Sequence, residues 1–143
     1  MINVGLALYT ASSKATGGRK GHVRSSDGTL DLILPLPKGV DGKEEAGMTN
    51  PEQLFSAGYA DCFDSALQMV ARQAKKKTTS SVTVSVSIEK KLKGFGLSVE
   101  LAVEIEGVSQ KEAEELVHQA HQVCPYSRAI WGNVKVKKTV KAI

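Results

Sequence analysis

Two stretches in the second half of the chain alternate strictly between apolar and polar residues. They are residues 81–92 (SVTVSVSIEKKL) and residues 97–106 (LSVELAVEIE), separated by a turn sequence, KGFG. Alternation with a period of two is typical of β-strands that bury one face. The two stretches therefore predict a long antiparallel hairpin with one face in water. Its apolar positions are Val82, Val84, Val86 and Ile88, then Leu97, Val99, Leu101, Val103 and Ile105.

Shorter strands are predicted near the start of the chain. Residues 4–10 (VGLALYT) are rich in β-forming side chains and predict a first strand, which a glycine-rich loop follows at residues 15–21 (ATGGRKG). Residues 22–25 and 29–34 predict two more strands, and an Asp-Gly turn between them indicates a hairpin. The segment at residues 35–47, which prolines and glycines interrupt, is predicted to be a polar loop.

Two helices are predicted from their start and stop signals. Asn50 is a helix-capping residue type, and the proline after it suits the first helical position, where its missing N–H would have no partner. This helix is predicted to run to about Lys76. Ser109 and Glu112 have the spacing of a capping box and predict a second helix, which Pro125 ends.

The remaining segments complete an α+β pattern. Residues 126–131 predict a short helical turn, and residues 133–141 predict a final strand. The resulting order is β-β-β-α-β-β-α-β, with mostly antiparallel pairing, which is typical of an α+β fold. At this length, and with no internal repeat, residues 1–143 are predicted to form a single domain.

The first long helix carries one of the two cysteines of the chain, Cys62. At 100° per residue, the thiol is predicted to face a core, and the small residues on its side of the helix allow another element to approach. That side is formed by Phe55, Gly58, Tyr59, Ala66 and Met69. A separate polar stripe is formed by Asp61, Asp64, Gln68, Arg72 and Lys75.

Composition and charge narrow the class of protein. The chain has 41% hydrophobic and 24% charged residues, as in ordinary globular proteins, and a formal net charge of +4. Nucleic-acid binding is disfavoured, because aromatic residues make up only 5% and the lysines at residues 135–141 alternate with valines, as on a half-buried strand. No apolar run has the roughly 20 residues of a membrane-spanning helix, and the first residues do not resemble a signal peptide. A cytoplasmic location is therefore predicted, where free thiols are expected.

The residues alone leave the role of the cysteines open. Cys62 and Cys124 could each be a small buried hydrophobe or a reactive thiol. A metal site is suggested by the spacing of His118, His121 and Cys124, but His118 points roughly 120° away from Cys124 on an ideal helix. The two histidines are therefore predicted to be helix-surface residues. A reactive thiolate would need a nearby cation, for which Arg19 in its glycine-rich loop is a candidate.

Three blocks of sequence resemble a known family. GGRKG around Arg19, NPEQLFSAGYADCF ending near Cys62, and VCPYSRAIWGN containing Cys124 are similar to the organic hydroperoxide resistance proteins, the Ohr branch of the OsmC superfamily. The resemblance covers essentially the whole chain, in the same order and spacing. It implies antiparallel sheets wrapped around central helices in an intertwined homodimer.

The resemblance also implies an enzyme, a thiol peroxidase that reduces organic hydroperoxides without haem, flavin or metal. Cys62 would be the peroxidatic cysteine and would become a sulfenic acid, and Cys124 would resolve it as a disulfide. Arg19 would stabilise the thiolate, and Glu52 would hold Arg19. A dithiol, notably a lipoyl group on a carrier protein, would reduce the disulfide again.

An apolar pocket around the thiol would suit organic hydroperoxides. Its predicted walls are Phe55, Tyr59, Phe63, Tyr126, Ile130 and Trp131, although each of these residues could instead be ordinary core. The alternative function is a non-catalytic stress-related, redox-sensing or ligand-binding protein of the same fold.

Overall fold

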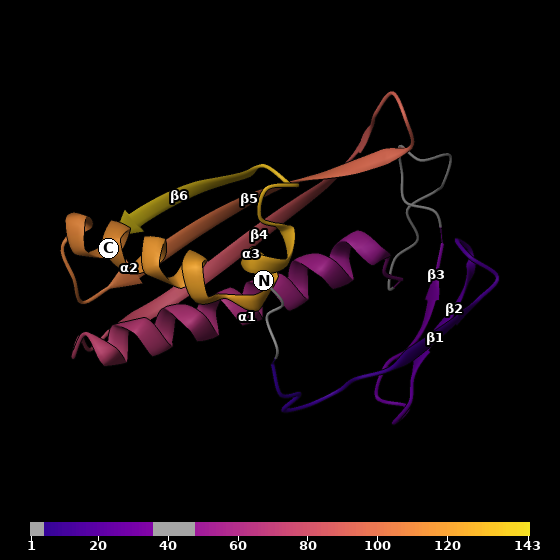
Figure 1. Cartoon of the computed structure of the whole chain (residues 1–143), viewed down its shortest axis with the longest axis horizontal. Coiled ribbons are helices and arrows are strands. Elements are labelled where there is room, and N and C mark those ends of the chain that lie inside the picture. Colours follow the sequence, from indigo (N-terminus) through magenta and orange to yellow (C-terminus); the bar gives the residue numbers. More distant parts are fainter. Residues whose placement is uncertain (1–4, 36–47) are drawn as a thin grey trace. The chain divides into compact units, whose positions relative to one another are not determined.

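Residues 5–35 and 48–143 are described by a computed structural model (Figure 1). The chain divides into two units, Met1–Pro51 and Glu52–Ile143. Each unit is considered by itself. The greater part of the loop predicted at residues 35–47 lies outside the described residues.

Strands β1 (Ser13–Thr16), β2 (Gly21–Ser25) and β3 (Asp31–Leu34) form the sheet of the first unit. All pairings are antiparallel in the order β1-β2-β3, and Ser13 lies opposite Ser25. The predicted hairpin between β2 and β3 is confirmed. His22 and Asp31 on its two strands form an ion pair.

The strand predicted at residues 4–10 is wrong for its described part. Residues 5–12 belong to no strand, and the first strand begins at Ser13, overlapping the predicted loop at residues 15–21. The β-forming side chains of this segment are exposed, at 91% for Leu6 and 98% for Leu8. Strand preference depends on packing against neighbouring strands, and residues 5–12 pair with no strand among the residues that the structure describes.

A tight turn links β1 to β2 and carries Arg19. Gly17 and Gly18 both have positive φ, 81° and 59°, a conformation that glycine adopts without the steric cost of a Cβ. A Cβ on Gly21 would lie 2.0 Å from the carbonyl oxygen of Thr16. The glycines predicted to form a loop are therefore required for a turn between two strands.

Helix α1 (Pro51–Gln73) belongs to the second unit from Glu52 onward; it starts at the predicted proline and ends three residues before the predicted Lys76. Its buried side chains follow one face and include Tyr59, Phe63 and Leu67. Met69, predicted on the thiol's side, is 38% exposed. This buried face anchors the helix in the core.

A second sheet follows, made of β4 (Thr79–Lys90), β5 (Phe95–Glu106) and β6 (Val136–Ala142). β4 and β5 form the predicted antiparallel hairpin, with Val84 opposite Leu101. β6 adds to β5 in parallel, because the helices between these strands return the chain to the end where β5 began.

Those intervening helices are α2 (Gln110–Val123) and α3 (Pro125–Ile130). The predicted capping box is present: the Glu112 backbone N–H donates to the Ser109 hydroxyl, and the Glu112 side chain accepts from the Ser109 backbone N–H. Cys124 lies between the two helices: it is the C-cap residue of α2 and the N-cap residue of α3.

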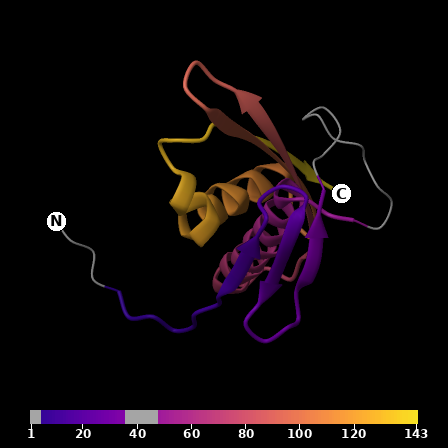
Figure 2. The same cartoon turned by 90° about the vertical axis from the view of Figure 1, so that its right-hand side faces the viewer.

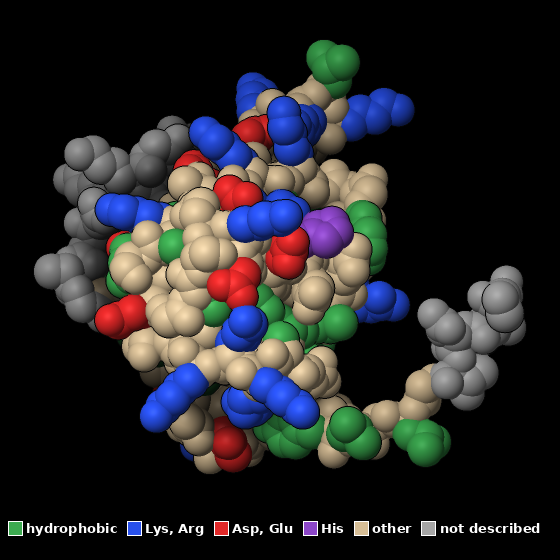
Figure 3. Space-filling view, turned by 90° about the vertical axis from the view of Figure 1, so that its left-hand side faces the viewer, with side chains coloured by type: hydrophobic (Ala, Val, Ile, Leu, Met, Phe, Trp, Pro, Cys, Tyr) green, Lys and Arg blue, Asp and Glu red, His purple; other side chains and the backbone are tan. Residues whose placement is uncertain are grey.

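Helices α1 and α2 lie on one face of the β4-β5-β6 sheet, and their apolar faces meet it in a single core (Figures 1 and 2). The opposite face is polar, with Glu100 beside Lys137 and Glu104 beside Lys141 in the parallel register. On the face of the molecule seen in Figure 3, acidic side chains lie among the lysines and arginines. This α+β architecture is the predicted one.

Within residues 5–35 and 48–143, no helix is long and apolar enough to cross a membrane.

Candidate functional site

Two thiols from distant parts of the sequence meet in the second unit. Cys62 lies in the middle of α1 and Cys124 between α2 and α3, and their sulfur atoms are 3.6 Å apart. Both cysteines are free. A disulfide has a sulfur–sulfur distance of about 2.05 Å, so the pair is reduced and needs only a short closure to form one.

Local sequence explains why each thiol lies where it does. Cys62 precedes the fully buried Phe63 and follows the fully buried Tyr59 by three residues, so its side of α1 is anchored in the core. Pro125 cannot donate the backbone hydrogen bond that would continue α2, and the chain turns at Cys124. Cys124 is completely buried, whereas Cys62 is half-buried.

Burial raises the pKa of the Cys62 thiol above its usual value. A hydrogen bond from the backbone N–H of Tyr126 acts in the opposite direction, because it stabilises the thiolate. The neighbouring Cys124 sulfur and, to a smaller extent, the Asp61 carboxylate raise the pKa further. In these surroundings the thiol needs an additional cation to react as a thiolate near neutral pH.

The second acidic neighbour of Cys62, Asp64, is engaged elsewhere. Its carboxylate accepts a 2.6 Å hydrogen bond from the Ser80 hydroxyl, which in turn accepts one from the Gln68 amide. These contacts join the polar stripe of α1 to the start of β4. Asp64 therefore has a structural role between helix and strand, away from the thiol.

An aromatic cluster lies on the same segments as the cysteine pair. Phe55, Tyr59 and Tyr126 form one cluster, with ring centroids 5.6–6.0 Å apart. Tyr59 and Phe63 are fully buried core residues, and Tyr126 is 37% exposed. The described contacts thus bring three of the predicted pocket residues together beside the thiols.

The other predicted wall residues lie farther out in the same unit. Ile130 packs at the edge of the core, at the end of α3. Trp131 is 60% exposed, and its ring lies 6.3 Å from the ring of His121. That these six residues form a substrate pocket stays a prediction.

Gly58 permits the close approach of α3 to α1. A Cβ at this position would lie 2.7 Å from the Tyr126 hydroxyl oxygen and 3.2 Å from the ring carbon that bears it. Gly58 lies one helical turn before Cys62, so the ring of Tyr126 covers the helix next to the thiol. Gly58 was predicted to be one of the small residues that allow another element to approach the helix, and α3 approaches α1 at this position.

Two residues of the site were not predicted from sequence: Ser127 and, in this role, His121. Ser127 is 1% exposed, and its hydroxyl lies 2.6 Å from the Tyr59 hydroxyl and 2.9 Å from Nδ1 of His121. His121 was predicted to be a surface residue, but it is half-buried between the rings of Phe63 and Trp131. The sequence signal that could have placed it there is its position on α2, next to the buried Ala120 and four residues after the buried Val117.

Burial lowers the pKa of His121, and the positive charge of Lys138 and the neighbouring His118 lower it further. His118 itself is exposed, and its Nε2 accepts a hydrogen bond from the Gln122 side-chain amide. Among the described residues, no three His, Cys, Asp or Glu side chains gather as ligands for a metal ion.

Arg19 and Glu52 are placed on separate units. Arg19 lies in the turn between β1 and β2, and Glu52 lies in the first turn of α1. Ten residues of uninterrupted helix, about 15 Å, separate Glu52 from Cys62 along the axis. Contact of the Arg19 guanidinium with Glu52 or with the thiol stays a prediction.

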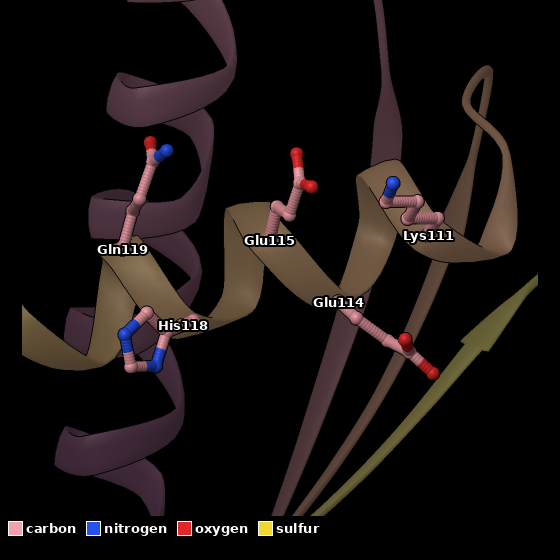
Figure 4. Close-up of a pocket in the computed structure, with 5 residues that line it drawn as sticks. All are labelled: Lys111, Glu114, Glu115, His118 and Gln119. Carbon is pink, nitrogen blue, oxygen red and sulfur yellow. The ribbon is translucent and has the colours of Figure 1, made fainter.

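A shallow recess on the outer face of α2 offers no comparable chemistry. It is lined by Lys111, Glu114, Glu115, His118 and Gln119. Figure 4 shows that these side chains diverge from the helix instead of converging on one point. The cysteine pair is therefore the candidate site.

The fold and the site together define a class: an α+β protein that holds two free thiols, from two separate segments, within contact distance. The chain belongs to the OsmC-like family, since the profile described as OsmC-like protein matches residues 42–139. Within that family it groups with the organic hydroperoxide resistance proteins, the Ohr branch, as the sequence blocks predicted.

Relatives with that name are similar over nearly their whole length. Organic hydroperoxide resistance protein OhrA of Bacillus subtilis is 51% identical over 131 residues, covering 90% of this chain and 93% of the relative. The organic hydroperoxide resistance protein of Xanthomonas axonopodis pv. citri is 48% identical over 135 residues, covering 93% and 94%.

A solved structure has the same fold. The crystal structure of an organic hydroperoxide resistance protein OsmC from Legionella pneumophila is 52% identical, with a TM-score of 0.89. The match covers 95% of this chain and 99% of that chain. These relatives confirm the predicted family and fold, and they support a role in organic hydroperoxide resistance.

Proposed function

We propose that this protein is a thiol-dependent peroxidase that reduces organic hydroperoxides to alcohols. The observation that carries the proposal is the 3.6 Å separation of two reduced sulfurs, Cys62 and Cys124, beside an aromatic cluster. The names of the relatives supply the substrate class. The proposed location is the cytoplasm and the proposed assembly is a homodimer.

In the first step, the Cys62 thiolate attacks the O–O bond of the hydroperoxide. A sulfur–oxygen bond forms, the O–O bond breaks, and the departing alkoxide takes up a proton to leave as the alcohol, so that Cys62 becomes a sulfenic acid. Because burial raises the pKa of this thiol, a cation is required, and Arg19 is the proposed one, oriented by Glu52. The backbone N–H of Tyr126 already contributes in that direction.

In the second step, the sulfur of Cys124 attacks the sulfenic sulfur. The Cys62–Cys124 disulfide forms and the hydroxyl leaves as water after protonation. A dithiol of the dihydrolipoyl type then reduces this disulfide by two exchange steps and is itself oxidised to a cyclic disulfide. No metal, haem or flavin takes part in this proposed cycle.

The test is hydroperoxide consumption by Cys62→Ser and Cys124→Ser variants. With cumene hydroperoxide as substrate and dihydrolipoamide as reductant, Cys62→Ser should lose turnover entirely, because serine cannot be oxidised in this way. With dihydrolipoamide withheld, Cys124→Ser should consume about one equivalent of hydroperoxide as Cys62 becomes a sulfenic acid. Excess hydroperoxide should then supply a second equivalent that oxidises Cys62 to sulfinic acid, which mass spectrometry detects.

The same assay separates this enzyme from a non-catalytic redox sensor of the same fold. A sensor would become oxidised at Cys62 but would not turn over repeatedly with dithiol present. Sustained consumption of hydroperoxide by Cys62→Ser would rule out the proposed mechanism. The circular dichroism spectrum of each variant controls for folding.

A further inference from the structure

A hydrogen-bonded chain of three side chains lies beside the two thiols. The Ser127 hydroxyl is 2.6 Å from the Tyr59 hydroxyl and 2.9 Å from Nδ1 of His121. The three residues come from α3, α1 and α2, respectively. Ser127 is a buried polar residue, and burying its hydroxyl would be costly without these hydrogen bonds.

Tyr59 and Ser127 are each three residues away from a cysteine in the sequence. Tyr59 precedes Cys62 by three residues on α1, and Ser127 follows Cys124 by three residues on α3. The Tyr59–Ser127 hydrogen bond therefore joins the two segments that present the sulfurs, one helical turn away from them. It is a long-range side-chain hydrogen bond between these segments, and neither of its residues is a cysteine.

We propose that Ser127 is a positioning residue: its hydroxyl, held between Tyr59 and His121, keeps Cys124 within bonding distance of Cys62 while both thiols are reduced. The inference rests on the proposed function, because it concerns the disulfide that the two cysteines would form. Ser127 acts through the backbone of α3 and does not touch the reacting sulfurs.

The direction of the hydrogen bonds follows from the protonation of His121. Neutral His121 with its proton on Nε2 accepts at Nδ1 from the Ser127 hydroxyl, which leaves the Ser127 oxygen free to accept from Tyr59. Burial also raises the pKa of Tyr59, so its hydroxyl keeps the proton that it donates. In this arrangement all three buried groups are satisfied.

Protonation of His121 would remove the acceptor at Nδ1. The imidazolium would donate to Ser127, which could then no longer donate to Nδ1, so one of the two hydroxyl protons of Ser127 and Tyr59 would lose its acceptor in a buried site. The titratable groups around His121 are His118 on its own helix, Lys138 on β6, and Tyr59 through Ser127. His118 and Lys138 both disfavour the imidazolium, which keeps the chain in its satisfied direction.

The hydrogen bonds of Ser127 should matter because Cys124 lies at the junction between α2 and α3. Its backbone N–H donates to the carbonyl of Ala120 at the end of α2, and its carbonyl accepts from Arg128 in α3. Small rotations at this junction would move the sulfur by more than the short closure that a disulfide needs. Holding two reacting groups in place raises their effective concentration.

The experiment measures the equilibrium between the Cys62 and Cys124 thiols and their disulfide in buffers of reduced and oxidised dithiothreitol. Ser127→Ala and, independently, Tyr59→Phe each break the same hydrogen bond from opposite ends. Each should lower the equilibrium constant for disulfide formation by about tenfold, a shift of about 30 mV toward a more oxidising potential. Alkylation of the remaining thiols followed by mass spectrometry gives the oxidised fraction.

The matched control is Ser65→Ala, which removes an exposed hydroxyl from α1 that donates to the backbone carbonyl of Asp61. It should leave the equilibrium constant unchanged. The double variant Ser127→Ala with Tyr59→Phe should behave like Ser127→Ala alone, because that variant already lacks the hydrogen bond that Tyr59→Phe removes.

Two outcomes would overturn the inference. If Ser127→Ala and Tyr59→Phe lower the melting temperature but leave the equilibrium constant at the wild-type value, Ser127 only stabilises the fold. If the wild-type protein forms no disulfide in these buffers, both this inference and the resolving step of the proposed function are wrong. The assay uses no hydroperoxide, so a failure of the peroxidase proposal alone leaves its result readable.

Discussion

At the scale of single residues, Cys62 is subject to opposing influences. Burial, the second thiol and Asp61 favour its protonated form, whereas one backbone N–H favours the thiolate. The net result is a raised pKa, which suits a thiol that should not be oxidised indiscriminately. In the proposed mechanism, Arg19 supplies the cation that activates this thiol.

His121 provides a prediction about pH at the same scale. Its pKa is lowered in the folded protein, so the unfolded chain takes up a proton first, near the ordinary value of 6.5. The free energy of unfolding should therefore fall as the pH drops from about 6.5 through the lowered value. His121→Gln should lose less stability over this range than the wild type, as measured by urea denaturation at pH 7 and pH 5.

The exposed His118 serves as the control for that measurement. His118→Gln should leave most of the pH dependence in place, because the buried ring of His121 would still be present. Equal pH dependence in the wild type and His121→Gln would show that protonation of His121 is not coupled to folding.

At the scale of secondary-structure elements, the site depends on how α3 meets α1. Tyr126 covers the helix at Gly58, Ser127 bonds to Tyr59, and Cys124 reaches Cys62. Each of these contacts pairs one position on the short helix segment with one on α1. The six residues of α3 are too few to form a stable helix alone, so packing on α1 must supply its stability.

Gly58→Ala tests this packing. In an exposed helix, alanine would be more favourable than glycine by about 1 kcal/mol. Here the new methyl group would meet the Tyr126 hydroxyl, so we expect Gly58→Ala to be destabilising by about 1 kcal/mol in urea denaturation. Adding Tyr126→Phe should recover part of the loss, because it removes the nearest atom and leaves the ring carbon at 3.2 Å.

The variant Ser65→Ala again provides a comparison, since it changes an exposed site of α1 that has no contact with α3 among its described hydrogen bonds. A Gly58→Ala protein that is more stable than the wild type would contradict the proposed close packing.

The end of α1 is joined to the start of α2 by an ion pair. Lys76 Nζ lies 2.6 Å from the Glu112 carboxylate, which also accepts from the Ser109 backbone N–H. These contacts lower the pKa of Glu112 from 4.5 to about 2, and the contact with Lys76 has the largest effect. The stabilisation is present above pH 4.5 and should be lost as the pH falls from about 4.5 to about 2.

Glu112→Gln should therefore lose less stability than the wild type on acidification across that range, while keeping a side chain able to complete the capping box. Denaturation midpoints at pH 6 and pH 3 measure the difference. Glu115→Gln, on the outer face of α2, is the matched control. An identical acid response of Glu112→Gln and the wild type would mean that the ion pair does not form in solution.

At the scale of the whole molecule, the parts of the fold with strong local signals were predictable. The β4–β5 hairpin followed from strict alternation, and α2 followed from its capping box and Pro125. The strand expected at residues 4–10 was wrong because β-forming side chains become a strand only beside a partner. Parallel addition of β6 to β5 also had no local signal.

The site was predictable only in part for the same reason. The position of Cys62 on a core-facing side of its helix followed from periodicity, but its approach to Cys124 depends on tertiary packing across 62 residues of sequence. The family resemblance supplied that pairing. Neither source indicated Ser127, because a serine that bonds two distant side chains looks, in sequence, like any other serine.

The unequal exposure of the two cysteines has a consequence for the direction of thiol exchange. Cys124 is completely buried, whereas Cys62 is only half-buried. An incoming dithiol that meets the oxidised protein should therefore attack on the Cys62 side, with Cys124 departing as the leaving group. The transient adduct with the reductant would then be carried by the same sulfur that first met the hydroperoxide, so a single opening would admit oxidant and reductant in turn.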